Sequence, residues 1–138
     1  MSPQGILETS TVILLPRLAD ATSLPEVPTT TAVTLAELSV GPLVARTGAE
    51  RAARQAHLQQ AEADFDAIPF GAAAARAFGQ VAADQRRAGR KTSGRAYDAL
   101  IAAIAIARGL PVYTVNPDDF AGISQLELIA IPHPDRAP

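Results

Sequence analysis

The stretch DALIAAIAIARGLPVYTVNPDD, residues 98–119, decides the fold. Residues 99–107 are apolar on every side of a helix, a pattern typical of a helix buried inside a domain. Gly109 and Pro111 end that helix, because glycine readily closes a helix and proline cannot continue one. The chain then predicts a strand up to Val115 and a turn at Asn116-Pro117-Asp118-Asp119. A buried helix that leads directly into a strand indicates an α/β domain.

The alternation of strands and helices continues on both sides of this stretch. Thr9-Ser10-Thr11 can supply N-cap hydroxyls to a first helix, Thr34 and Glu37 have the spacing of a capping box, and Thr92 or Ser93 can cap the buried helix. Helices are predicted at residues 9–16, 34–45, 49–66, 71–89 and 95–108, and strands at residues 6–7, 29–33, 67–70, 111–115 and 127–131. We therefore expect one domain over residues 1–138, with a mostly parallel five-stranded sheet covered on both faces and a frayed tail at residues 132–138.

Composition limits the chemistry that this domain can perform. Of the 138 residues, 48% are hydrophobic and 19% charged, as in ordinary globular domains. The absence of cysteine excludes disulfides, thiolate metal sites and a cysteine nucleophile. His57 and His133 lie far apart and are expected to be solvated, so any metal would be held mainly by oxygen, as Mg²⁺ or Mn²⁺ prefers. No apolar run is long enough to cross a bilayer and no basic leader is present, so we expect a soluble, cytoplasmic protein.

Several acidic residues fall where strands end or helices begin. Glu8 ends the first strand, Asp98 lies in the first turn of the buried helix, and Asp118 and Asp119 follow the fourth strand. Each has an ordinary explanation by itself. The helix dipole favours Asp98 by about 0.3–1 kcal/mol, Glu37 would complete the capping box, and aspartate is a preferred turn residue.

These acids converge if the first and fourth strands are neighbours in the sheet. Glu8, Glu37, Asp98 and Asp119 would then cluster at one sheet edge, where open α/β sheets bind their ligands. Like charges so close raise one another's pKa or recruit a cation, and oxygen ligands suit magnesium or manganese. A metal held in this way can lower the pKa of a bound water and stabilise displacement at phosphorus, which is the chemistry of a nuclease.

Four segments carry a recognisable order of motifs: residues 6–10 (ILETS), 32–38 (AVTLAEL), 98–103 (DALIAA) and 109–116 (GLPVYTVN), the last leading into Asp119-Phe120. In these segments, and nearly from end to end, the chain resembles the PIN-domain ribonucleases, in particular the VapC toxins of bacterial type II toxin–antitoxin systems. The resemblance implies a PIN-like three-layer α/β/α fold and a magnesium-dependent endoribonuclease toxin, with manganese as a substitute ion. It also implies inhibition by a VapB-like antitoxin and a homodimer that presents apolar grooves to it, which the alanine-rich helix at 49–66 permits.

The resemblance also assigns roles to the acidic residues. Glu8 and Asp98 become metal ligands, and Glu37 becomes a ligand or a catalytic acid that positions water. Asn116 and Asp119 become the fourth, catalytic corner of the site, and Asp118 and Asp119 are nearby substitutes as metal ligands.

Two positions depart from the family pattern. The acid of the first strand is ordinarily aspartate, whereas Glu8 is one methylene longer, and magnesium tolerates geometric error poorly. Many PIN domains carry an acid where this chain has Asn116. The alternative is therefore a catalytically weak or silent PIN-like module that binds RNA or a protein. A receiver-like phosphate acceptor would need a paired acid at the first strand and a lysine at the last, and the chain has neither.

Basic residues gather just before Asp98. Five of the 12 are Arg86, Arg87, Arg90, Lys91 and Arg95. Because an acidic metal site repels phosphate, we expect Arg95, Lys91 and Arg90 to hold the RNA backbone, with Arg95 one helical turn before Asp98. The competing explanation is a solvated helix end, since arginines also complement the dipole of a helix C-terminus.

Overall fold

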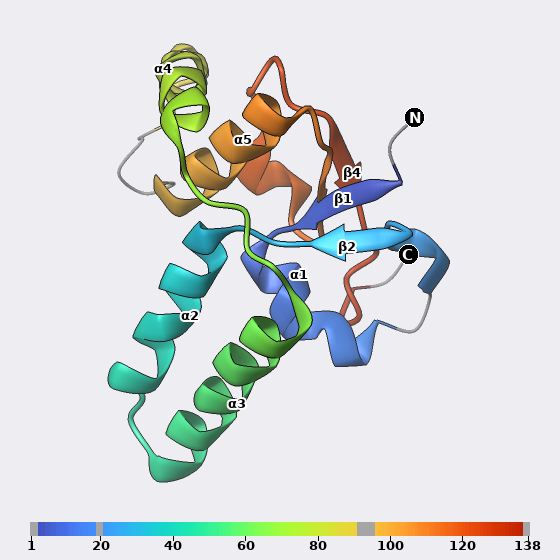
Figure 1. Cartoon of the computed structure of the whole chain (residues 1–138), viewed down its shortest axis with the longest axis vertical. Helices are drawn as coiled ribbons and strands as arrows, with labels where there is room; N and C mark the ends of the chain where they lie inside the picture. Colours follow the sequence, from blue (N-terminus) through green and yellow to red (C-terminus); the bar gives the residue numbers. More distant parts are fainter. Residues whose placement is uncertain (1–2, 19–20, 91–95, 137–138) are drawn as a thin grey trace.

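The computed structural model describes residues 3–18, 21–90 and 96–136 (Figure 1). At its centre lies a sheet of four strands, β1 (Gln4–Leu7), β2 (Val27–Thr29), β3 (Val112–Thr114) and β4 (Leu128–Ala130). The strands are hydrogen-bonded in the order β2-β1-β3-β4, and each neighbouring pair is parallel. The predicted parallel α/β sheet is confirmed, with four strands in place of five.

Strands β1 and β3 are direct neighbours, with Ile6 opposite Val112 and Leu7 opposite Tyr113. Gly5 makes room for the ring of Tyr113 against β1, because a Cβ atom there would collide with that ring. The first and fourth predicted strands are therefore adjacent, as the convergence of the acidic residues requires. The chain leaves both strands at the same edge of the sheet.

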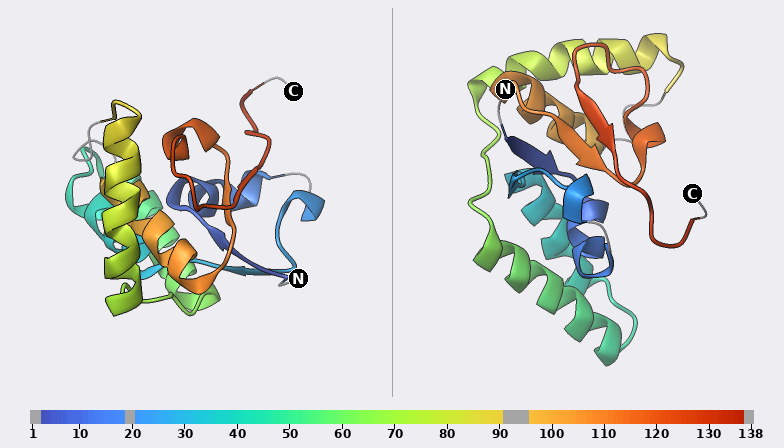
Figure 2. Two further views of the ribbon diagram at one scale, coloured as in Figure 1. Left: turned by 90° about the horizontal axis from the view of Figure 1, so that it is seen from above. Right: turned by 90° about the vertical axis from the view of Figure 1, so that its right-hand side faces the viewer.

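Helices cover both faces of the sheet. They are α1 (Thr9–Leu14), α2 (Ala32–Leu43), α3 (Gly48–Asp64), α4 (Ala72–Arg87) and α5 (Ala96–Arg108), joined in part by the short 3-10 helices η1 (Leu15–Arg17), η2 (Ala21–Ser23) and η4 (Pro117–Phe120). Figure 2 shows α4 and α5 together on one side, and α2 and α3 on the other. Helix α2 also contacts α5, which brings the two helices that carry predicted site acids together.

Successive residues of β1 point into opposite cores. Ile6 packs in the cluster that contains Val81 of α4 and Ile101 of α5, whereas Leu7 packs with Val12 of α1 and Leu38 of α2. This alternation is the period-two pattern of a strand that is buried on both faces. The three-layer α/β/α arrangement is therefore confirmed, as is the burial of the apolar helix.

The strand predicted at residues 67–70 does not form. Ile68 makes an isolated parallel bridge to Thr31, in which its N–H donates to the Thr30 carbonyl at 3.0 Å. Pro69 has no N–H with which to extend a ladder, and the chain turns at Gly71 into α4. The five-stranded sheet was therefore wrong by this one strand.

The second strand and the helix after it begin earlier than predicted. Strand β2 ends at Thr29, and Thr31 is the N-cap of α2, its side chain accepting a hydrogen bond from the Thr34 N–H at 3.2 Å. The predicted capping box of Thr34 and Glu37 does not form, so that prediction was wrong. Because Thr29, Thr30 and Thr31 are consecutive, the sequence offers several equivalent caps.

Glycine ends two helices as predicted. Gly109 has a φ of 66° after α5, and the Leu110 N–H donates to the Ala105 carbonyl at 3.0 Å. Gly89 has a φ of 75° after α4. The predicted caps of α5, Thr92 and Ser93, lie outside the described residues. Within the described ranges, no helix is long and apolar enough to cross a membrane.

Residues 132–136, which the sequence places in a frayed tail, run back along the body of the protein. Asp135 forms an ion pair with Arg17 in η1. Arg136 donates a hydrogen bond to Asn116, directly beyond β3. Residues 137 and 138 lie outside the described part of the chain.

Candidate active site

Glu8 lies at the junction between β1 and α1, and its carboxylate caps that helix. Oε2 accepts from the Ser10 N–H at 3.0 Å, and Oε1 accepts from the Thr11 N–H at 2.9 Å and the Thr11 hydroxyl at 2.7 Å. The Ser10 hydroxyl also donates to Oε1. Only 4% of the residue is exposed, so this carboxylate is buried and satisfied by protein donors.

The cap of α1 therefore differs from the prediction. The hydroxyls of Ser10 and Thr11 do not cap the helix themselves but donate to Glu8. The carboxylate of Glu8 is the cap, because it accepts hydrogen bonds from the backbone N–H groups of Ser10 and Thr11. An anion is favoured there because unpaired N–H groups gather at a helix N-terminus. The Glu8 side chain thus folds back over its own helix.

Glu37 lies in the second turn of α2 and faces α1. Its Oε1 accepts a hydrogen bond of 2.6 Å from the Thr9 hydroxyl. Burial raises the pKa of Glu37, the nearby charge of Glu8 raises it further, and the hydrogen bond from Thr9 opposes both. The two acids are therefore near neighbours, and Glu37 does not cap its helix.

Asn116 joins the site from the other strand. Its Nδ2 donates to the Ser10 Oγ at 2.9 Å, and its Oδ1 accepts from Arg136 at 3.1 Å. Its backbone N–H is held by the Thr114 hydroxyl at 2.9 Å. A continuous chain of hydrogen bonds thus runs from Glu8 through Ser10 and Asn116 to Arg136.

The remaining predicted acids lie on α5 and η4, two elements that contact each other. Asp98 is half-buried in the first turn of α5. Asp118 and Asp119 belong to η4, where the Asp119 N–H donates to the Asn116 carbonyl at 3.1 Å. Asp118 is exposed, whereas Asp119 is partly buried.

The donors at this edge fit a hard divalent cation in their chemistry. Carboxylate and amide oxygens are the ligands that Mg²⁺ or Mn²⁺ prefers. Among the described residues, no three acidic or histidine side chains are arranged to hold an ion in this conformation. Glu8 contributes to this result, because its oxygens are directed at its own helix.

The predicted RNA-binding residues fall mostly outside the described ranges. Arg90 follows α4, is partly buried, and donates its backbone N–H to the Gln85 carbonyl at 2.8 Å. Lys91 and Arg95 belong to the segment that the structure does not describe. The roles of these three residues remain predictions.

Sequence reasoning did not single out Thr9, Ser10 and Arg136, which hydrogen-bond to the candidate residues. The run Thr9-Ser10-Thr11 is typical of helix caps, but three hydroxyls after a strand end can equally donate to nearby carboxylates. Arg136 carried no signal, because it lies in a segment rich in proline that was expected to be frayed.

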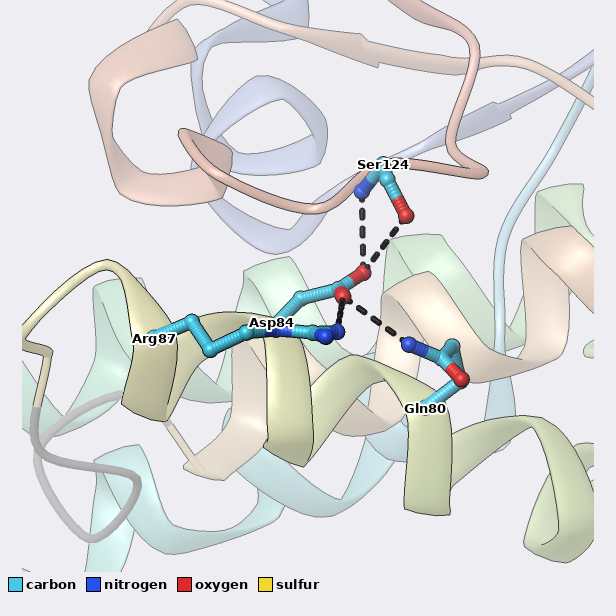
Figure 3. Close-up of polar contacts among 4 residues, drawn as sticks. All are labelled: Gln80, Asp84, Arg87 and Ser124. Atoms are coloured by element: carbon cyan, nitrogen blue, oxygen red, sulfur yellow. Dashed lines mark hydrogen bonds and ion pairs between the residues drawn. The ribbon is translucent and has the colours of Figure 1, made fainter.

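A second acidic residue with many donors, Asp84, serves the fold. Its carboxylate accepts from the Ser124 N–H at 3.0 Å and hydroxyl at 2.8 Å, from Gln80 at 3.0 Å and from Arg87 at 2.6 Å (Figure 3). The Ser124 N–H and then Gln80 hold the pKa of Asp84 well below its usual range. These contacts tie α4 to the segment between η4 and β4.

The sequence of this chain is similar to a known protein family and to a named ribonuclease. The family model described as PIN domain matches residues 8–125. Ribonuclease VapC5 of Mycobacterium tuberculosis (strain ATCC 25618 / H37Rv) is 39% identical over 132 residues, which covers 92% of this chain and 95% of that protein.

Solved structures agree with this similarity. A member of the VapBC family of toxin–antitoxin systems, VapBC-5 from Mycobacterium tuberculosis, matches with a TM-score of 0.80 and 36% identity over 94% of this chain and 100% of that chain. VapBC2 from Rickettsia felis, bound to a DNA fragment from their promoter, matches with a TM-score of 0.72 and 20% identity over 91% of this chain and 96% of that chain. The second likeness shows the fold alone.

Proposed function

Because this chain belongs to the PIN-domain family, and within it to the VapC ribonucleases, we propose that it is a metal-dependent endoribonuclease toxin restrained by a VapB-like antitoxin. The observation that carries the proposal is the contact of Thr9 with Glu37 at 2.6 Å, beside Glu8, at the carboxyl edge of the sheet. A carboxylate is held there, partly buried and close to a second one. Such a pair is stabilised by a divalent cation.

Asp98 would hold the ion, together with Glu8 once an oxygen turns away from α1. Glu37 would either join them as a ligand or position the attacking water. Asn116 and the acids of η4, Asp118 and Asp119, would complete the set. We favour Mg²⁺, with Mn²⁺ as a substitute, because the donors are oxygen atoms. When bound, such an ion lowers the pKa of a water ligand and stabilises charge on the phosphate.

The chain's own residues supply positioning and proton transfer. Thr9 fixes one oxygen of Glu37, which leaves the other free of that contact and able to orient the attacking water. Arg95, Lys91 and Arg90 would hold the RNA backbone against the repulsion of the acids.

A groove between α1 and α3 suits the antitoxin. It has a volume of about 470 Å³ and is lined largely by apolar side chains, among them Val12, Ile13, Leu15 and Phe65. An apolar segment of a VapB-like antitoxin would bury these side chains. We further propose that the protein is a homodimer and that it acts in the cytoplasm, where its RNA substrate occurs.

One observation favours the alternative of a catalytically weak or silent PIN-like module. Glu8 accepts four hydrogen bonds from Ser10 and Thr11, so moving an oxygen toward an ion would break part of its cap. Purified protein, free of antitoxin, should be incubated with total RNA in Mg²⁺, Mn²⁺ or EDTA. Cleavage in either metal that EDTA abolishes supports the enzyme, and RNA binding without cleavage supports the silent module.

A further inference from the structure

The segment after β4 returns to the candidate site through specific contacts. Beyond β4, the Ile131 N–H still donates to the Thr114 carbonyl at 2.8 Å. The chain then turns, with the Asp135 N–H donating to His133 Nδ1 at 3.0 Å and the Arg136 N–H to the His133 carbonyl at 3.1 Å. This turn is anchored from outside by Arg17.

Arg17 anchors the segment through both arms of its guanidinium group. Nη1 donates to Asp135 Oδ2 at 3.3 Å, and Nη2 contacts Asp135 Oδ1. This paired geometry is the preferred one between arginine and a carboxylate. It fixes the residue next to Arg136 and so limits where Arg136 can lie.

The guanidinium group of Arg136 lies against neutral acceptors. Nη2 donates to Asn116 Oδ1 at 3.1 Å, and Nη1 donates to the Val115 carbonyl at 3.4 Å. In the part of the chain that the structure describes, no carboxylate is within ion-pair distance of it. Because the residue is exposed, its positive charge and its remaining N–H donors face solvent.

The positive charge of Arg136 lies close to the acidic residues of the candidate site. Asn116 is bonded to Ser10, and Ser10 is bonded to Glu8, so Arg136 stands at the rim of the acidic site. Acidic side chains repel the phosphates of RNA, and a cation at the rim offsets that repulsion. Arginine suits this task because its planar fork can donate two hydrogen bonds to one phosphate.

We propose that Arg136 binds a backbone phosphate of RNA at the edge of the site, and that the Arg17–Asp135 ion pair positions it for this contact. The inference rests on the proposed function for its substrate class. It adds a binding residue, contributed by the segment after β4, to those before Asp98.

Binding can be tested without cleavage, by titrating fluorescently labelled total tRNA in EDTA over a series of NaCl concentrations. Arg136→Ala should weaken binding about tenfold. It should also reduce the slope of log Kd against log salt by about 0.7–0.9, the value for one lost phosphate contact. Arg136→Lys should keep most of that slope, because it keeps the charge. Thermal unfolding checks that each variant is folded.

Arg108→Ala is the matched control. Arg108 is exposed at the end of α5, just before the chain enters β3, and so lies at the opposite edge of the sheet. The proposal predicts wild-type binding for this variant. An equal loss in Arg108→Ala and Arg136→Ala would overturn it, because the effect would then be one of total charge.

Asp135→Asn should change RNA affinity in opposite directions under two explanations, one in which only net charge matters and one in which the ion pair positions Arg136. Removing an acid should tighten RNA binding if only net charge matters. The proposal predicts weaker binding, because Arg136 is no longer positioned. Tighter binding by Asp135→Asn, or an unchanged salt slope in folded Arg136→Ala, would overturn the proposal.

Adding Mg²⁺ or Mn²⁺ to the same samples separates this inference from the enzymatic proposal. If wild type binds RNA through Arg136 but cleaves in neither metal, the enzymatic function fails and the inference stands. If wild type cleaves and Arg136→Ala has the wild-type salt slope and KM, the inference fails and the function stands.

Discussion

The Thr9 hydroxyl links α1 to Glu37 on α2, with Oγ1 2.6 Å from Glu37 Oε1 and 3.0 Å from Thr34 Oγ1. A hydroxyl has a single proton, and Thr9 gives it to Glu37, so Thr34 must be the donor to Thr9. Two buried threonines thus act in series to hold one carboxylate. Burial raises the pKa of Glu37, the hydrogen bond from Thr9 lowers it, and the charge of Glu8 raises it further, so the net shift is upward.

Glu37→Gln should not destabilise the protein at neutral pH in EDTA. The folded-state pKa of Glu37 is raised, so the folded protein binds this proton more tightly than the unfolded chain. The resulting stabilisation is complete below about pH 4 and is lost as pH rises through the folded-state pKa. At pH 7 the variant should therefore melt at or above the wild-type temperature, with a difference that varies with pH over this window. A clear loss of stability at pH 7 would contradict this account, and Glu62→Gln on the exposed face of α3 is the control.

Glu8→Asp should keep the fold and increase cleavage. Aspartate is a favoured N-cap, so the stability of α1 should change by less than about 1 kcal/mol. The shorter side chain would cap with one oxygen and direct the other toward an ion. Misplacement by about 1 Å can cost on the order of a hundredfold in rate, so the gain could approach that size. Metal titration should show tighter Mg²⁺ binding alongside faster cleavage, and a variant with neither gain would show that Glu8 is not an impaired ligand.

Asp84→Asn should lower the melting temperature at neutral pH. The Ser124 N–H, Gln80 and the other donors hold the pKa of Asp84 below its usual range, so its contribution to stability is present above the unfolded-state pKa near 4. That contribution is lost as pH falls toward the folded-state pKa. The difference between variant and wild type should therefore narrow below about pH 4. Asp64→Asn, at the exposed end of α3, should melt close to wild type, and a pH-independent difference at Asp84 would refute the electrostatic account.

Ala56→Arg should block the antitoxin without affecting cleavage. Ala56 lines the groove between α1 and α3, and a long charged side chain would occupy the space for an apolar segment. We expect at least a tenfold rise in the Kd for a VapB-like antitoxin, by the usual scale of central interface residues. Ala53→Arg, exposed on the same helix, should bind normally. Equal affinities for both variants would place the antitoxin elsewhere.

Much of the fold follows from local pattern. The apolar run after Asp98 and Gly109 with Pro111 define α5 and β3, because they combine a helical face without polar residues and two strong helix terminators. The missing fifth strand was less predictable. Residues 67–70 have the apolar character of a strand, but Pro69 prevents a ladder of backbone hydrogen bonds. Among the described residues, the only pairing of this segment is the bridge between Ile68 and Thr31, and its length depends on the tertiary position of Thr31.

The candidate site could be predicted as a set of residues but not as a geometry. Glu8, Glu37 and Asn116 are brought to one edge, as the order of strand ends suggested. The direction of the Glu8 carboxylate could not be predicted, since it depends on competition between an ion and the N–H groups of α1. The role of Arg136 depends on the Arg17–Asp135 pair, which joins residues far apart in sequence and leaves no local pattern.

The rate of RNA cleavage by wild type and Glu37→Gln, each with Mg²⁺ and with EDTA, tests the central claim most directly. We expect wild type to cleave total RNA in Mg²⁺ and to stop in EDTA. Folded Glu37→Gln should be slower by about a hundredfold or more, since even residues that only support metal ligands contribute 10–100-fold. Cleavage that persists in EDTA, or a Glu37→Gln variant that cleaves at the wild-type rate, would contradict the assignment of this acidic edge as a metal-dependent ribonuclease centre.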